Sequence, residues 1–205
     1  MTGDAALRRP ELAGLELADP AARWQALGFT VGEDGRFTVG GVVMEVGRGG
    51  RGITGWAIRG LSGDGAIDGL ATEGVELAAP GDGGAPHPNG VLAVDHVVVV
   101  TPAFDRLSAV LDARGLTLRR VRQAGERRQG FRRLGPTIME IVEAPEADAT
   151  AFWGLTFTVA DLGALAARLG PLLGEARDAV QPGRRIATVR REAGLSTAVA
   201  FMDLE

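Results

Sequence analysis

The chain has 205 residues, 45% of them hydrophobic, and a formal net charge of −4 at pH 7. This length suits one large domain or two small ones. The acidic balance argues against nucleic acid as the main partner, because binding phosphates requires a basic face. Cys, Lys and Tyr are absent and there are only two His. Thiol nucleophiles, disulfides and Schiff-base chemistry are therefore excluded.

No stretch approaches the roughly 18 consecutive apolar residues of a membrane span. The first residues, MTGDAALRRPELAG, lack the apolar middle of a signal peptide. We therefore expect no membrane partner and a cytoplasmic location.

The front half predicts short strands joined by Gly-rich turns. Asp19 and Pro20 are typical of a helix start, with Asp19 as N-cap, and the helix ends at Gly28. The segment 66–74 favours a weak helix. The expected strands cover residues 12–18, 29–31, 36–39, 42–46 and 55–61.

Residues 79–90, APGDGGAPHPNG, form the clearest break in the chain, because seven of these twelve positions are Gly or Pro. Such a composition suits a linker or an ordered crossover loop. The continuous apolar run at 91–100 then predicts a strand buried on both faces. A helix opened by Pro102, three strands and a second strand–helix–strand series follow.

Two segments resemble one another. RFTVGGVVMEV (36–46) and FRRLGPTIMEIV (131–142) each end in an apolar strand with one carboxylate, Glu45 or Glu140. In both, a Gly lies five positions before the Glu, Gly40 in the first and Gly135 in the second. Repeated units that cannot close a core alone pack together, and we expect a ligand in the cleft that they share.

A strand DHVVVV, a Pro-led helix and three strands, the last with a Glu, resemble the vicinal oxygen chelate superfamily. The motifs GRGITGWAIRGL, HPNGVLAVDHVVV, RRQGFRRLGPTIMEIVE, FWGLTFTVADL and AVQPGRRIATVRREAGL resemble an actinobacterial glyoxalase-like group of unassigned activity. The resemblance implies an α+β fold of βαβββ units paired into cupped, open-barrel sheets. It divides the chain into a degraded half (1–78, one worn and one truncated unit), the linker (79–90) and a complete domain of two units (91–205).

The resemblance also implies metal ligands on the first and last strands of a unit, the places that His96 and Glu140 occupy. An imidazole and a carboxylate suit Fe, Mn, Ni or Zn. When the last unit is aligned with this one by its helix, Gly154 takes the place that corresponds to His96, and the final strand has no acid at the place that corresponds to Glu140. The alternative is that His96 pins the strand beside Asp95 and that Glu140 pairs with an arginine.

Alternation along RRQGFRR places Gln129, Phe131 and Arg133 on one face of a strand, and Arg128 and Arg132 on the other. If Arg133 and, from the last unit, Arg185 line the cup, they can hold a carboxylate or phosphate by two-pronged contacts. We expect Arg133 to pair with Glu140 when the cup is empty. The alternative is a solvated face on an edge strand.

Trp56 and Trp153 stand at similar places in related strands. They are either core residues or stacking walls at the mouth of the cup.

The leading functional hypothesis is a protein that binds a small anionic or oxygenated organic molecule in the cup, with catalysis not necessarily retained. One alternative is a metal-dependent lyase, isomerase or dioxygenase that uses His96 and Glu140. Another is a scaffold for protein interaction. Truncated units leave open sheet edges, so we also expect a homodimer.

Overall fold

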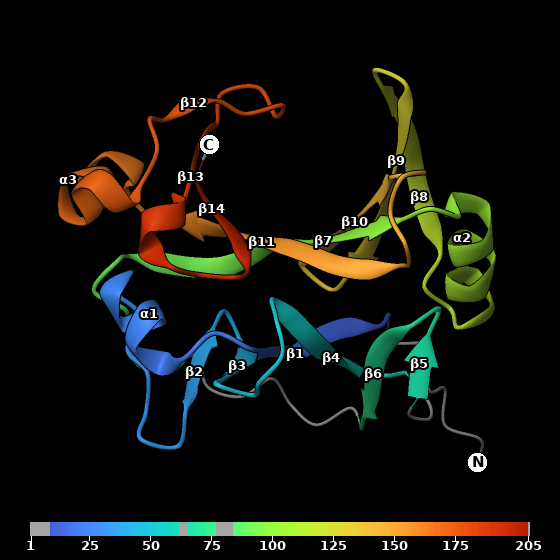
Figure 1. Cartoon of the computed structure of the whole chain (residues 1–205), viewed down its shortest axis with the longest axis horizontal. Helices are drawn as coiled ribbons and strands as arrows, with labels where there is room; N and C mark the ends of the chain where they lie inside the picture. Colours follow the sequence, from blue (N-terminus) through green and yellow to red (C-terminus); the bar gives the residue numbers. More distant parts are fainter. Residues whose placement is uncertain (1–8, 62–64, 77–83, 205) are drawn as a thin grey trace, which may run out of the picture.

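The computed structural model describes residues 9–61, 65–76 and 84–204. Strands form two mixed sheets with few helices (Figure 1). The α+β fold expected from the sequence is confirmed, and both sheets are open cups rather than closed barrels.

The front sheet has six strands in the order β2-β3-β1-β4-β6-β5. Its first strand is followed by one short helix, and β1 pairs in parallel with β3, while β4 pairs in parallel with β6. The elements are β1 (Glu11–Leu17), α1 (Ala21–Ala26), β2 (Arg36–Val39), β3 (Val42–Val46), β4 (Ile53–Arg59), β5 (Gly65–Ile67) and β6 (Leu70–Val75).

The rear sheet has eight strands in the order β12-β13-β14-β11-β7-β10-β9-β8. Each of its halves is a strand, a helix and three further strands, and the two halves meet where β7 and β11 pair antiparallel. The first half contains β7 (Val91–Thr101), α2 (Phe104–Ala113), β8 (Leu118–Ala124), β9 (Arg127–Leu134) and β10 (Thr137–Glu143). The second contains β11 (Ala151–Val159), α3 (Leu162–Leu169), β12 (Arg177–Asp178), β13 (Arg185–Thr188) and β14 (Ala198–Asp203).

The two sheets face one another across a common hydrophobic core (Figure 1). Trp24 of α1 is fully buried, and its ring lies edge-on to Phe157 of β11 at 6.5 Å. Trp56 of β4 contacts Phe152 of β11 in the same manner at 5.1 Å. Because the sheets bury these faces against each other, the cup of each opens on the side away from its neighbour.

The repeated glycines lie where each half of the chain approaches the other. Gly40 has φ +57°, and a Cβ there would lie 3.0 Å from the carbonyl oxygen of Leu92. Gly135 has φ +65°, and its Cβ would lie 2.8 Å from Cγ of Glu11. Both turns therefore need a residue that has no side chain and adopts a left-handed backbone conformation. This requirement explains why Gly precedes Glu45 and Glu140 at the same spacing.

The weak helix expected at 66–74 is wrong, because this segment forms the hairpin of β5 and β6. Asp68 and Gly69 occupy its turn with φ of +50° and +94°. An Asp-Gly pair with both φ values positive favours a tight hairpin, so turn chemistry outweighs the helical spacing of the apolar residues.

Residues 79–83 of the expected linker lie outside the described part, but 84–90 form an anchored crossover. Nδ1 of His87 accepts a hydrogen bond from the backbone N–H of Thr30 at 3.0 Å. The amide of Asn89 donates to the carbonyl of Leu27 at 3.0 Å. Among the described helices, none is long and apolar enough to cross a membrane.

Candidate functional site

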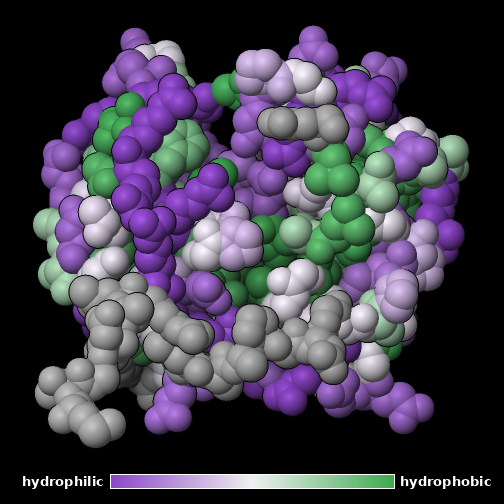
Figure 2. All heavy atoms as spheres, turned by 180° about the vertical axis from the view of Figure 1, so that it is seen from behind, coloured by the Kyte–Doolittle hydropathy of each residue, from purple (hydrophilic) through white to green (hydrophobic). Residues whose placement is uncertain are grey.

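The cup of the rear sheet holds a cavity of about 810 Å³. β8 and β9 rise on one side of it and β12 and β13 on the other (Figure 1). Viewed from behind, hydrophilic side chains stand on both sides of the hollow at the top of the molecule (Figure 2). The side chains that carry chemistry here are His96, Arg119, Arg120, Arg122, Arg133, Glu140, Thr156, Arg177 and Asp178.

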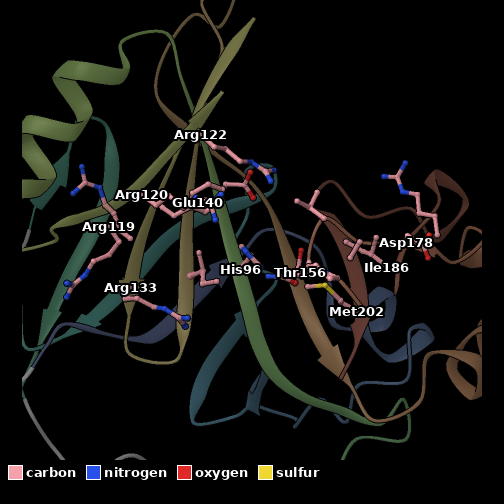
Figure 3. Close-up of a pocket in the computed structure, with 18 residues that line it drawn as sticks. His96, Arg119, Arg120, Arg122, Arg133, Glu140, Thr156, Asp178, Ile186 and Met202 are labelled. Atoms are coloured by element: carbon pink, nitrogen blue, oxygen red, sulfur yellow. The ribbon is translucent and has the colours of Figure 1, made fainter. Parts of the chain in front are cut away.

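The strand register sets the floor of the cup. His96 on β7 lies opposite Ile138 on β10 and Thr156 on β11. Glu140 follows Ile138 by two residues, so alternation along the strand turns both toward the same face. The intervening Val97 and Met139 point into the core and are fully buried. His96 and Glu140 therefore share the cup, as the sequence predicts (Figure 3).

His96 is oriented by its sequence neighbour. Its Nδ1 forms a close contact with Oδ2 of Asp95, which leaves Nε2 as the nitrogen available to a ligand. Asp95 also accepts hydrogen bonds from Arg184 at 3.0 Å and from Thr158 at 3.2 Å. Burial acts to raise the pKa of Asp95, but the contacts with His96 and Arg184 outweigh burial and lower it to about 2. Asp95 is therefore ionised at neutral pH.

Glu140 lies in a different environment. Burial raises the pKa of its carboxyl group, and electrostatic interactions with nearby His96 and Arg122 offset only part of that effect. Among the described residues, no group hydrogen-bonds to the Glu140 carboxylate or lies within ion-pair distance of it. The pairing of Glu140 with Arg133 that we expected is therefore absent here.

Arg122 of β8 is the cation that reaches toward Glu140 (Figure 3). Its Nε donates to Oε1 of Gln129 at 2.5 Å, and its guanidinium lies over the Phe131 ring at 5.4 Å from the centroid. Sequence reasoning missed Arg122, although a signal was available. A tight β8–β9 turn places Arg120 opposite Phe131 and Arg122 opposite Gln129.

Two of the three residues that were predicted to share one face of β9 line the cup. Phe131 and Arg133 line the cavity, whereas Gln129 acts through its bond to Arg122. Arg133 is exposed and donates to the carbonyl oxygen of Pro136 at 3.0 Å.

The other face of β9 packs on α2, as alternation predicts. Arg128 is bonded to Asp105 and Glu143, with its guanidinium 4.6 Å from the centroid of the Phe104 ring. Arg132 is buried and forms an ion pair with Asp112 at 2.5 Å. These two arginines therefore hold the helix on the sheet.

Three of the proposed ligand-binding residues lie elsewhere. Arg185 points away from the cup and binds Asp203 at 3.0 Å, because its neighbour Ile186 takes the inward position. Trp56 is a core residue, 2% exposed, whose indole N–H donates to Thr72 at 2.8 Å. Trp153 is 59% exposed and does not line the cavity.

The donor set does not fit a metal ion. Zinc sites in proteins, both structural and catalytic, have at least three protein ligands, and non-haem iron sites commonly have two His and one carboxylate. The floor of the cup offers the free nitrogen of His96 and the carboxylate of Glu140, and the facing strands contribute Thr156 and Met202. Asp178 also lines the cavity, but it does not come together with these two donors. Throughout the described ranges, no group of three or more His, Cys, Asp or Glu side chains comes together.

The front sheet has its own cup, with a cavity of about 710 Å³. Its Glu45 is the repeat counterpart of Glu140, but here arginines neutralise the carboxylate. Arg36 lies 2.5 Å and Arg48 2.7 Å from Glu45, and Arg48 also approaches Glu16 at 3.9 Å. The two cups therefore differ in charge pairing although they share an architecture.

Comparison with solved structures identifies the fold. The chain is similar to a variant of 4-hydroxymandelate synthase from Streptomyces coelicolor, with TM-score 0.62, 15% identity, and 94% of this chain and 92% of that one covered. A fusion of a xylose isomerase-like TIM barrel with a 4-hydroxyphenylpyruvate dioxygenase gives TM-score 0.65 at 12% identity. That match covers 94% of this chain and 49% of the fusion protein.

Methylmalonyl-CoA epimerase from Mycobacterium tuberculosis matches over 57% of this chain, with TM-score 0.48 and 16% identity. No protein-family model and no curated protein sequence matches the chain. The chain shares its fold with these two solved structures, and this is the glyoxalase-like fold that the sequence resemblance implied. At these identities the similarity establishes the fold and leaves the activity to the residues of the cup.

Proposed function

We propose that the rear cup binds a small organic molecule through an anionic group, a carboxylate or a phosphate. The observation that carries this proposal is the charge of the cup, which is opposite in sign to the net charge of −4 of the whole chain. Arginines outnumber carboxylates among the lining residues, which include Arg119, Arg120, Arg122, Arg133 and Arg177 against Glu140 and Asp178.

These arginines are available to a ligand. Within the part of the chain that the structure describes, Arg119, Arg120 and Arg177 have no carboxylate within ion-pair distance. Arg122 is held by a neutral amide and an aromatic ring, and among the described residues it forms no ion pair, although its charge acts on nearby Glu140. A positioned guanidinium presents several N–H donors in one plane and matches the two oxygens of a carboxylate.

The front cup supports the same conclusion by contrast. There, Arg36 and Arg48 already engage the carboxylate of Glu45, so an incoming anion would have to displace a protein group. In the rear cup no such displacement is needed. Oriented His96 and Thr156 add polar groups on the floor that can hydrogen-bond the oxygens of the bound molecule.

The test is a thermal-shift screen of carboxylates, phosphates, diols and aromatic acids, followed by calorimetry on the hits. We expect anionic compounds to stabilise the protein, and Arg122→Ala to weaken their binding at least tenfold. Arg36→Ala is the matched control, because it removes an arginine from the front cup, and it should bind the same compounds normally. No response to any anion would overturn the proposal and favour the protein-interaction scaffold.

A further inference from the structure

The two walls of the rear cup differ in chemistry. The wall made by β8 and β9 carries Arg120, Arg122 and Arg133, with Arg119 at its outer edge (Figure 3). The ring of Phe131 also lines this wall. Every charged side chain that this wall turns to the cavity is a cation. Glu140 lies beside it, on β10.

The opposite wall is largely apolar. Ile186 of β13 lies opposite Met202 of β14 in the strand register, and both line the cavity. The segment that follows β12 adds Ala179, Val180 and Pro182 to this wall. Its charged members are Arg177 and Asp178 of β12, which carry opposite charges and therefore give this wall no net charge.

Val180 is the most informative residue of this wall. It is 74% exposed, although it lines a cavity, so its side chain has little protein contact of its own. The segment is nevertheless held in place, because Arg184 binds Oε1 of Gln181 at 3.1 Å, Asp95 at 3.0 Å and the carbonyl of Asp203 at 2.8 Å. An exposed apolar side chain on a tethered segment is a contact surface that needs no rearrangement to receive a ligand.

We propose that the ligand of the rear cup has two different ends, an anionic group held by the arginines of β8 and β9 and an apolar body that packs against Val180, Ile186 and Met202. This inference rests on the proposed anion binding and names the class of molecule: an acid or phosphate ester with an aliphatic or aromatic body. A cavity of about 810 Å³ is large enough for a molecule that reaches both walls.

The opposed walls also fix the direction in which such a molecule binds. Its anionic end is attracted by Arg120 and Arg122 on one side, whereas the other wall offers no net charge to it. The floor between the walls is formed by His96, Thr156 and Glu140, so polar groups near the middle of the molecule would meet hydrogen-bonding partners there. A small inorganic anion would contact the arginines of β8 and β9 but would not reach the apolar wall.

The experiment is a calorimetric series of straight-chain carboxylates from acetate to octanoate and of alkyl phosphates from methyl to octyl, at fixed salt. Alcohols of equal length serve as uncharged comparators. We expect affinity to rise about fourfold for each methylene that becomes buried, until the chain spans the cup. The alcohols should bind at least tenfold more weakly.

Two variants separate the ends. Val180→Ser should weaken octanoate severalfold and leave acetate unchanged, whereas Arg122→Ala should weaken every acid. Val110→Ser alters a valine of α2, 37% exposed and outside the cup, and should leave the whole series unchanged. Affinity independent of chain length would overturn the two-ended ligand and leave anion binding intact. Failure of all acids and phosphates to bind would overturn both.

Discussion

Asp19 accepts hydrogen bonds from both the backbone N–H and the hydroxyl of Thr197, at 3.0 and 2.9 Å. Its other oxygen accepts the same pair from Ser196, at 2.7 and 2.9 Å. Asp19 follows β1 and Thr197 precedes β14, so one buried carboxylate joins the two sheets. Burial opposes ionisation of Asp19, but these four hydrogen bonds outweigh it and lower its pKa.

We therefore predict that Asp19→Ala lowers the free energy of unfolding by about 3 kcal/mol, because it leaves the buried backbone N–H of Thr197 and the part-buried one of Ser196 without acceptors. Urea denaturation measures the change. Asp148→Ala is the control, since Asp148 is exposed, and it should shift stability by less than about 0.5 kcal/mol. Equal stability of the two variants would show that the Asp19 contacts contribute little.

A second prediction concerns pH. The pKa of Asp95 is about 2 in the folded protein, below its usual 3.8. A lowered pKa contributes stability that is complete above the unfolded value and is lost as pH falls through the folded one, here between about 4 and 2. At pH 6, Asp95→Asn should be less stable than the unaltered protein by about 2 kcal/mol. The gap should shrink when urea midpoints are measured near pH 2.5, and a gap independent of pH would contradict this linkage.

Part of this arrangement could be predicted from the sequence. The repeat around Glu45 and Glu140 predicted one cleft shared by both copies, but each glutamate lies in a cup of its own and hydrophobic core fills the space between the sheets. Alternation along the apolar strand did place Glu140 on the cup face, because it fixes which side chains share a face. The same rule placed Arg132 opposite Arg133, and the structure shows Arg132 buried against α2. These features depend on local spacing, which a single sequence contains.

The rest depends on pairings between distant segments. Asp19 was expected to cap α1, but Pro20 is the N-cap residue and Asp19 binds residues 177 and 178 positions away. Arg185 was expected in the cup, but its neighbour Ile186 takes the inward position, and a shift of one residue exchanges the two faces of a strand. The pairing of Arg122 with Gln129 is a local exception, because the two residues face each other across the β8–β9 hairpin and its turn gave a signal in the sequence.

A third prediction ranks the two arginines of the cup. Arg122 is held by Gln129 and Phe131, whereas Arg133 is exposed and, within the described ranges, is bonded only to a backbone carbonyl. A pre-positioned guanidinium loses less entropy on binding, so Arg122→Ala should weaken an anionic ligand more than Arg133→Ala does. Arg122→Lys should also bind weakly, because the two-pronged contact is lost. If calorimetry finds a larger loss of ligand affinity for Arg133→Ala than for Arg122→Ala, then Arg133 and not Arg122 is the main anion-binding residue.

A fourth prediction is a homodimer. The two sheets end in the edge strands β2, β5, β8 and β12, and unpaired edges favour association with a second copy. Size-exclusion chromatography with light scattering at micromolar concentration should give twice the chain mass of 21.3 kDa. A clean monomer under those conditions contradicts the prediction.

The last prediction concerns metal. Because the cup supplies two donors where about three are needed, protein purified without chelators should carry well below one Fe, Mn, Ni or Zn ion per chain. Thr156 lies directly opposite His96, so Thr156→His would add a third donor at the same level of the sheet. We expect that variant to bind Zn²⁺ or Ni²⁺ more tightly than the unaltered protein in calorimetry. Stoichiometric metal in the unaltered protein that disappears in His96→Ala would instead favour a metal-dependent enzyme.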